Sequence, residues 1–277
     1  MIAYRLLTNT DFTAVHDCFL SAFSDYEVDM RMSREQFQQR LTRDGIALEM
    51  SAGAFDGEVM IGFCLNAVGE WLGKTTAYDG GTGIVPAHRG RGIGKELFTF
   101  VEGELKRAGV AQYLLEVLTS NVPAATLYRK LGFAETRRLA VFRRSASQRG
   151  AKELDIRPVQ QPDWQLLQTF WDGYPSWQNS IDAVERVTNE RIVLGAYADD
   201  ACVGYGVVFV PAMNLMQLAV SPQHRRRGIG SALLASLETS ESLQINNIDE
   251  KLKGSLAFYE ANGYKQVLGQ FEMIKTL

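Results

Sequence analysis

The sequence contains few of the residues that build metal sites or disulfide frameworks. Three cysteines (Cys18, Cys64 and Cys202) and three histidines are scattered over 277 residues. Neither set has the spacing of a zinc site, and an odd number of distant cysteines does not suggest disulfide pairing. We therefore expect no bound metal and a protein of the reducing cytoplasm.

The chain also lacks a strong excess of charge and a long apolar run. Lys and Arg number 29 against 32 Asp and Glu, which gives a net charge of −3. So small an imbalance gives little attraction to nucleic acid or to an anionic membrane. No apolar run reaches the roughly 18 residues of a membrane span, and the opening MIAYRLLTNTDF lacks a signal-peptide pattern. We expect no nucleic-acid partner and no membrane partner.

What remains is the composition of an ordinary globular protein, with 46% apolar and 22% charged residues. The length corresponds to about two domains of roughly 150 residues. An internal repeat supports this count: GIVPAHRGRGIGKEL at 83–97 matches LAVSPQHRRRGIGSALL at 218–234, and LYRKLGF at 127–133 matches FYEANGY at 258–264. The polar stretch Arg143–Lys152 reads as a linker, so we predict domains 1–147 and 148–277.

Each half places a glycine-rich turn between a strand and a helix. In the first half, a short apolar strand at 83–85 precedes the turn, and apolar residues recur at helical spacing from Ile93 to Leu105. The second half repeats this order with a strand at 217–220 and a helix from Ile229. The pattern Arg-x-x-Gly-x-Gly is therefore expected at the N-terminus of a helix.

This position favours an anion. The first amides of a helix have no internal partner, the helix dipole attracts negative charge, and glycine allows close approach to the backbone. Five arginines are expected to add mobile positive charge around the two turns: Arg89, Arg91, Arg225, Arg226 and Arg227. A Walker loop and a dinucleotide fingerprint both fail, because Glu96 follows Gly94-Lys95 and Leu97 stands where a third glycine is required. We predict a pyrophosphate site, with a turn that simply begins a helix as the alternative.

The segment Arg89-Gly-Arg-Gly-Ile-Gly94, followed by Asn121-x-x-Ala124-x-x-Leu127-Tyr128-x-x-x-Gly132-Phe133, resembles the Gcn5-related N-acetyltransferase (GNAT) superfamily. The second half is similar. The resemblance implies two tandem α/β domains, each a mostly antiparallel twisted sheet flanked by helices, with splayed central strands. It also implies acetyl-CoA as co-substrate, with the pyrophosphate on the turn and the pantetheine arm along the preceding strand. The coenzyme residues are then Ile84, Val85, Arg89, Gly90, Arg91, Gly92, Ile93, Gly94, Lys95 and Asn121 in the first half, and Ala219, Val220, Arg225, Arg227, Gly228 and Gly230 in the second.

The resemblance assigns Tyr128 as the general acid that protonates the leaving thiolate. The alternative from the residues alone is a core tyrosine at a helix–sheet contact. Glu116, an isolated carboxylate in an apolar strand, is the candidate general base, and Asp79 is a second one. A strand-edge salt bridge and a turn residue are the respective alternatives. A backbone N–H near Ile84–Val85 is the candidate donor to the developing oxyanion.

Asp25, Glu27 and Asp29, with Tyr26, lie between two predicted helices. A cluster of carboxylates favours a cationic acceptor, and a solvated acidic loop is the alternative. We expect a small-molecule or peptide amine as the partner, and a monomer or a homodimer.

The second half departs from the pattern. Leu252 stands where the first half has Asn121, with Asn246 or Asn247 as replacements for the missing amide. We therefore assign the chemistry to the first half. An aromatic cluster of the second half either lines a pocket or packs between the halves: Trp171, Tyr174 and Trp177.

Together these features predict an acetyl-CoA-dependent N-acetyltransferase. O-acetyl transfer stays open, and so does an acyl-CoA-binding or sensing protein without turnover. A nucleotide or NAD protein is disfavoured by the failed fingerprints.

Overall fold

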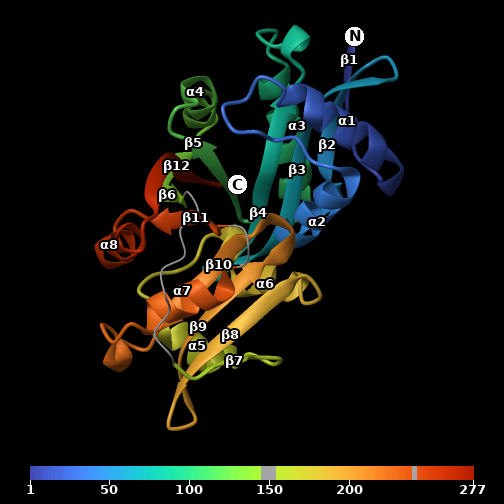
Figure 1. The fold of residues 1–277 in the computed structure, drawn as a ribbon. Helices are drawn as coiled ribbons and strands as arrows, with labels where there is room; N and C mark the ends of the chain where they lie inside the picture. The colour runs from blue at the N-terminus through green and yellow to red at the C-terminus, as the bar shows by residue number, and fades with distance from the viewer. Residues whose placement is uncertain (145–153, 239–241) are drawn as a thin grey trace. The chain divides into compact units, whose positions relative to one another are not determined.

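The computed structural model describes residues 1–144, 154–238 and 242–277, which form two compact units (Figure 1). Unit 1 comprises Met1–Thr136 together with Phe271–Leu277, and unit 2 comprises Arg137–Gln270. The predicted boundary between residues 147 and 148 lies outside the described residues. Of the predicted linker, Arg143 ends a strand and Arg144 forms an ion pair with Glu238, whereas residues 145–152 also lie outside the described ranges.

Unit 1 is built on a sheet that is antiparallel except at one strand pair. Its strands, in hydrogen-bonded order, are β1 (Ile2–Leu6), β2 (Ile46–Asp56), β3 (Val59–Trp71), β4 (Lys74–Ile84) and β5 (Gln112–Leu118). The pair β4–β5 is parallel. A parallel pair needs a crossover, and the 15-residue helix α3 (Ile93–Arg107) provides it.

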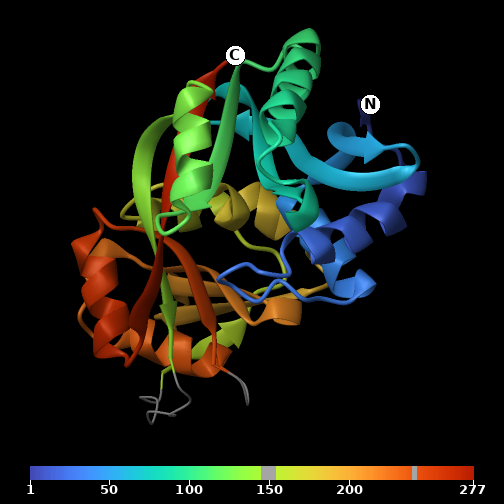
Figure 2. The ribbon, with the colours of Figure 1, turned by 90° about the horizontal axis from the view of Figure 1, so that it is seen from above.

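Helices cover both faces of this sheet (Figures 1 and 2). On one face, α1 (Phe12–Ala22) and α2 (Arg34–Asp44) pack on Phe63 and Leu65 of β3. On the other face, α3 and α4 (Val122–Lys130) pack on Cys64 of the same strand. Successive side chains of a strand point to opposite faces, so β3 contributes to two apolar layers at once.

Unit 2 repeats this plan, and its first three helices are shorter than those of unit 1. Its strands are β7 (Ile156–Pro158), β8 (Arg191–Ala198), β9 (Ala201–Phe209), β10 (Asn214–Val220) and β11 (Gln244–Asp249). Its helices are α5 (Trp164–Leu167), α6 (Ile181–Arg186), α7 (Ile229–Leu237) and α8 (Lys253–Ala261). With 9 residues against 15, α7 is shorter than α3, in line with the shorter spacing between the second-half motifs.

Each unit is completed by a strand segment from the other half of the chain. In unit 2, Leu139, Ala140 and Phe142 of β6 (Ala134–Arg143) pair with β11. In unit 1, the end of β12 (Lys265–Thr276) buries Met273 in the core, and the Leu277 amide donates to Ala111 O at 3.0 Å. A cut between the halves would therefore remove a strand from both units.

Among the described residues, no helix is both long enough and apolar enough to cross a bilayer.

Candidate functional site

A bulge in β4 marks the end of its pairing with β5, and we call the edge of β4 beyond the bulge that faces away from β3, at Gly81–Ile84, the slot. The parallel pairing of β4 with β5 runs from Thr76–Gln112 to Asp79–Leu115 and ends there. At the same point, Gly80 is an extra residue in the β3–β4 register, which makes it the bulge. A Cβ on Gly80 would stand 2.5 Å from Ile46 Cδ1, so a side chain does not fit without a shift. Beyond the bulge, β4 continues to Ile84 away from β5.

Unit 2 contains the same combination of a bulge and an interrupted parallel strand pair. Its central strand β10 pairs with β11 at Asn214–Gln244 and Leu215–Ile245, and the bulge follows at Met216. Beyond it, β10 continues to Val220. In each unit, therefore, the parallel strands separate just before the glycine-rich turn.

The backbone amides of these free strand ends alternate between two directions. The Val85 amide donates to Ile61 O of β3 at 2.9 Å, so it is not available to an oxyanion. Because amides alternate along a strand, the Ile84 amide faces the slot. In unit 2, Ser221 N donates to Val203 O at 2.9 Å, so the Val220 amide faces the slot there. Of the two predicted oxyanion donors, Ile84 is the one that the backbone geometry favours.

The turns use left-handed backbone at matching positions. Gly90 and Gly92 have φ of 74° and 80°, and Arg226 and Gly228 have φ of 63° and 88°. Gly92 and Gly228 are the N-caps of α3 and α7, and neither has a side chain to bond the first helical amides. A helix start without a side-chain cap is what the predicted anion site requires.

Arg89 is held by the protein itself. Its Nε donates to Ile84 O at 3.0 Å and its Nη2 to Ala22 O at 2.7 Å. Its Nη1 also donates to Asp25 Oδ2 at 2.7 Å. The expectation of mobile charge at Arg89 is therefore wrong, because the guanidinium fastens the turn to the end of α1.

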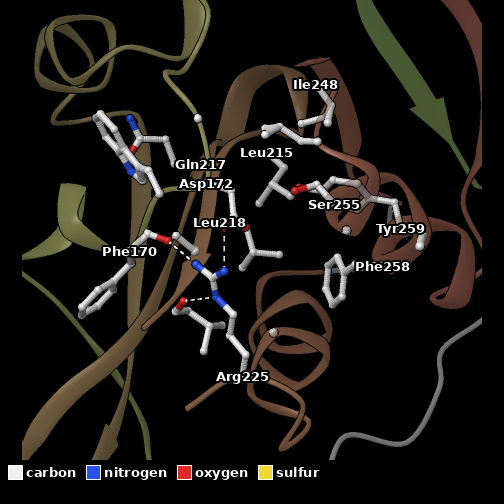
Figure 3. A pocket seen from close by; sticks show the side chains of 18 of the residues that line it. Phe170, Asp172, Leu215, Gln217, Leu218, Arg225, Ile248, Ser255, Phe258 and Tyr259 are labelled. Atoms are coloured by element: carbon white, nitrogen blue, oxygen red, sulfur yellow. Dashed lines mark hydrogen bonds and ion pairs between the residues drawn. The ribbon is translucent and has the colours of Figure 1, made fainter. Parts of the chain in front are cut away.

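Arg225 is held in the same way in unit 2. It bonds Val220 O at 2.9 Å, Phe170 O at 2.9 Å and Asp172 Oδ1 at 2.7 Å (Figure 3). The cations at the outer edge of the turns are different. Arg91, Lys95 and Arg227 are exposed. Arg91 Nη1 lies 3.2 Å from His88 Nδ1 and Arg227 Nη2 donates to Gln223 O at 3.2 Å, so each of these exposed arginines contacts a nearby residue of its own segment.

Tyr128 lies in the core of unit 1. It is 8% exposed, and its ring centroid stands 5.3 Å from that of Phe98 and 5.9 Å from that of Phe133. Burial raises the pKa of its phenol well above 10, and the nearby charge of Asp79 adds to the effect. The hydroxyl therefore stays protonated near neutral pH. Tyr259 of unit 2 is also buried, and burial raises its pKa.

Asp79 is a buried carboxylate at the bulge, within β4. It accepts hydrogen bonds from Gly81 N and Thr82 Oγ1, both at 2.9 Å. Burial raises its pKa to about 6, although these two hydrogen bonds stabilise the charged form and act to lower the pKa. Its expected place in a turn is wrong, because the two glycines after it belong to a bulged strand.

Glu116 lies on β5, one residue past the last pair with β4. Its Oε2 accepts a hydrogen bond from Tyr78 OH at 3.1 Å. Its charge acts on Arg43 of α2, which places it on the α1/α2 side of the sheet. Tyr128 packs on the α3/α4 side, so these two predicted catalytic groups lie on opposite faces of the sheet.

Two family models match the sequence, and together they span most of the chain. The Acetyltransferase (GNAT) family model matches residues 12–133, and the Acetyltransferase (GNAT) domain model matches residues 189–266. The chain belongs to the GNAT superfamily as a tandem protein. The predicted family and the predicted mixed α/β fold are confirmed.

Two relatives of this tandem GNAT protein are acetyltransferases by name. Streptothricin acetyltransferase of Streptomyces lavendulae is 34% identical over 79 residues, 28% of this chain and 40% of its own. Mycothiol acetyltransferase of a Nocardioides species is 32% identical over 125 residues, 41% of this chain and 42% of its own. The chain thus spans about two fifths of the length of these relatives.

A solved tandem GNAT protein of the clavulanic acid biosynthesis pathway has the same fold. It superposes with a TM-score of 0.75 over 100% of this chain and 98% of its own, at 15% identity. At that identity the likeness concerns the fold alone.

Two of the three carboxylates in the acidic loop of this GNAT protein have an arginine partner. Asp25 pairs with Arg89, and Asp29 pairs with Arg31 at 2.6 Å. Glu27 Oε2 accepts a hydrogen bond from Ser120 Oγ at 2.5 Å. The expected attraction of this loop for a cationic acceptor is therefore not supported.

Asn121 joins this loop to α4. Its side chain accepts a hydrogen bond from Ala124 N at 3.2 Å, which caps the helix, and it also bonds the hydroxyl of Tyr26. In unit 2, Leu252 takes its place at the start of α8 and makes no side-chain cap. At this helix start the Leu252 carbonyl accepts backbone hydrogen bonds from Ser255 N at 2.9 Å and Leu256 N at 3.1 Å.

Unit 2 of the GNAT protein contains a cavity of about 710 Å³ beside its slot (Figure 3). Arg225 and Asp172 lie at one side, and Phe258 and Tyr259 at the other. Of the predicted aromatic cluster, Trp171 and Tyr174 line the cavity, and Trp177 is buried apart from it. The strand registers place Leu215 at the position of Asp79, and Asn246 at that of Glu116.

Sequence reasoning missed two groups. Asp172, which holds Arg225, lies in an irregular segment that carries no motif. Arg40 and Asp44 share the stripe of α2 that also carries Phe37 and Leu41, so charge at apolar positions was the available signal. Within residues 1–144, 154–238 and 242–277, no group of three metal-binding side chains is found.

Proposed function

We propose that this protein transfers an acetyl group from acetyl-CoA to a primary amine of a small molecule or peptide. The observation that supports it best is the duplicated pair of separated strands, each followed by a left-handed glycine turn that opens a helix. A slot with amides at its edge suits an amide-bearing arm, and the uncapped helix suits a pyrophosphate.

The coenzyme would lie along the end of β4. The amides of Ile93, Gly94 and Lys95 would receive its pyrophosphate, with Arg91 as the exposed cation beside them. Ile84 would present its amide to the thioester carbonyl, where negative charge develops as the amine attacks. Holding the two reactants together supplies much of the acceleration.

We assign the chemistry to unit 1. The attacking amine nitrogen forms the new C–N bond, and the carbon–sulfur bond of the thioester breaks. Asp79 or Glu116 would take the proton that the amine loses, and Tyr128 would give a proton to the sulfur. Both carboxylates are replaced in unit 2, by Leu215 and Asn246, so that unit lacks these bases.

The comparison of the two units also favours a second function, for unit 2. Its cavity, its turn and its clamped arginine are all present, but its two acidic positions are apolar or amide. We propose that unit 2 binds an acyl-CoA without turning it over.

The test is a thiol-release assay with acetyl-CoA and a panel of acceptors. The panel contains a polyamine, an aminoglycoside, a lysine peptide, streptothricin (because one relative is named for it) and an alcohol of similar size. Mass spectrometry of the product should show an N-acetyl group. If calorimetry shows no acetyl-CoA binding to the full chain, the proposal is wrong.

A further inference from the structure

The bulge of β4 is held from both faces of the sheet. From α2, Arg40 Nη2 donates to the carbonyl of Gly80, the bulge residue itself, at 3.1 Å. On the other face, the Asp79 carboxylate accepts from Gly81 N and Thr82 Oγ1. The peptide at which β4 leaves β5 therefore has a side-chain partner on each side.

Arg40 is itself fixed. Its Nε stands 3.7 Å from Asp44 Oδ2, and its guanidinium carbon lies 5.3 Å from the centre of the Phe19 ring. Asp44 is fully buried and also bonds Arg43 Nε at 2.7 Å. Keeping ion pairs on the inner stripe of a helix is costly, and apolar residues would pack there without that cost. The buried charges on this face of α2 therefore lower the stability of the fold, and they also place a cation at the bulge.

We propose that Arg40 is a positioning residue for acetyl transfer, because its bond to Gly80 O holds the bulge that separates β4 from β5. This inference rests on the proposed function. Without that bond, the peptide after Gly80 is held by Asp79 from one face alone, and β4 can move toward pairing with β5. Such a movement would narrow the slot and displace the Ile84 amide from the thioester carbonyl.

The charge of Arg40 also acts on Asp79. It lowers the pKa of that carboxyl against the effect of burial. The other titratable groups around Asp79 come from three elements and are Cys64 of β3, Tyr113 of β5 and Tyr128 of α4. All three are neutral near pH 7, because burial raises their pKa values. Arg40 is thus the cation that acts on Asp79, and its removal should raise the pKa of Asp79 above about 6.

The second unit holds its bulge by other means. Gln217, the residue after Met216, donates to Asn179 O at 2.7 Å and accepts from Tyr205 OH at 2.7 Å. Neither of these bonds involves a charged group. An effect of Arg40 on the slot should therefore be confined to unit 1.

The experiment compares three variants of the full chain with the wild type. Arg40→Met keeps the length of the side chain and removes the charge and the donors. Arg40→Lys keeps the charge and shortens the reach to Gly80 O. Arg34→Met is the matched control, because Arg34 lies exposed on the same helix. Asp44 keeps its bond to Arg43 in every variant, so we expect each to fold.

Two readouts separate positioning from a general loss of structure. The first is kcat/KM for acetyl-CoA against pH, with thermal unfolding as the check on folding. The second is hydrogen exchange at Gly81–Ile84, which needs no activity.

For Arg40→Met we expect about a tenfold loss of kcat/KM, the size typical of a lost hydrogen bond from a charged donor. Its acidic limb should move to higher pH, and exchange at Gly81–Ile84 should change. Arg40→Lys should restore the acidic limb, and Arg34→Met should match the wild type. The proposal is overturned if folded Arg40→Met keeps wild-type kcat/KM and exchange. If Arg40→Met does not fold, an unshifted kcat/KM and exchange in Arg40→Lys overturn it. A wild type that binds no acetyl-CoA would instead refute the proposed function.

Discussion

Arg89 grips Asp25 with both terminal nitrogens, at 2.7 Å from Nη1 to Oδ2 and 2.9 Å from Nη2 to Oδ1. Arg225 repeats the contact with Asp172 at 2.7 Å. Each guanidinium also bonds a carbonyl before its turn and one at the end of a helical segment. The first arginine of the motif therefore supports the turn, and its charge is already balanced.

This arrangement predicts the same outcome for two opposite charge changes. Arg89→Ala and Asp25→Ala should each weaken acetyl-CoA binding roughly three- to tenfold, because either one releases the turn. Calorimetric titration measures the Kd, and Asp29→Ala, which removes an exposed carboxylate of the same loop, is the control. Tighter binding in Asp25→Ala would mean that Arg89 serves the phosphates directly.

The two turns can be tested separately with glutamate at their N-cap glycines. Gly92→Glu should abolish transfer, because the carboxylate occupies the anion site and the left-handed backbone is strained. Gly228→Glu should leave transfer intact and remove one of two acetyl-CoA sites in a calorimetric titration. Gly109→Glu is the matched control, since Gly109 has φ of 76° at the far end of α3. Loss of transfer in Gly228→Glu would place the chemistry in unit 2.

Tyr128→Phe removes one hydroxyl from a packed ring. We expect kcat to fall about a hundredfold, as for loss of a general acid, with the Kd for acetyl-CoA unchanged. Tyr259→Phe, the matching change in unit 2, should leave kcat at the wild-type value. Stopped-flow thiol release gives kcat, and an unaltered rate in Tyr128→Phe would assign the tyrosine to the core alone.

The raised pKa of Asp79 predicts a dependence of stability on pH. The folded carboxyl has a pKa of about 6 against 3.8 as the reference, so between these values the folded state holds more protons. The free energy of unfolding therefore falls as the pH rises through this window, by roughly 3 kcal/mol over the whole window. Urea unfolding at pH 4.5 and pH 7 should show this fall, and Asp79→Asn should flatten it. An equal slope in both proteins would show that the pKa is not raised.

Because the end of β12 belongs to unit 1, we expect the last residues of the chain to stabilise that unit. Met273 is fully buried in the unit 1 core, and Lys275 pairs with Glu102 at 2.5 Å. Met273→Ala should lower the free energy of unfolding by roughly 2–5 kcal/mol. Thr276→Ala, an exposed change on the same strand, should cost little. Differential scanning calorimetry measures both, and a stable Met273→Ala would contradict the strand assignment.

Local sequence patterns predicted those parts of the site that depend on neighbouring residues alone. The glycine turn follows from steric freedom at positive φ, and the helix after it follows from an apolar stripe. The residues that Arg89 and Arg40 each bond could not be predicted in this way. Their partners Asp25 and Gly80 lie 64 and 40 residues away in the chain, and side-chain patterns carry no record of such contacts.

Local sequence was enough to predict the duplication and the two turns, because repeated motifs and helical periodicity are properties of neighbouring residues. The fold family came from the resemblance of these motifs to the GNAT superfamily. Tertiary structure decided which charges are free. It pairs Asp25 with Arg89 and Asp29 with Arg31, buries Asp79 and Tyr128, and completes the first unit with the strand of Met273. These outcomes depend on which distant groups share a low-dielectric interior, where an ion must find a partner or change its pKa.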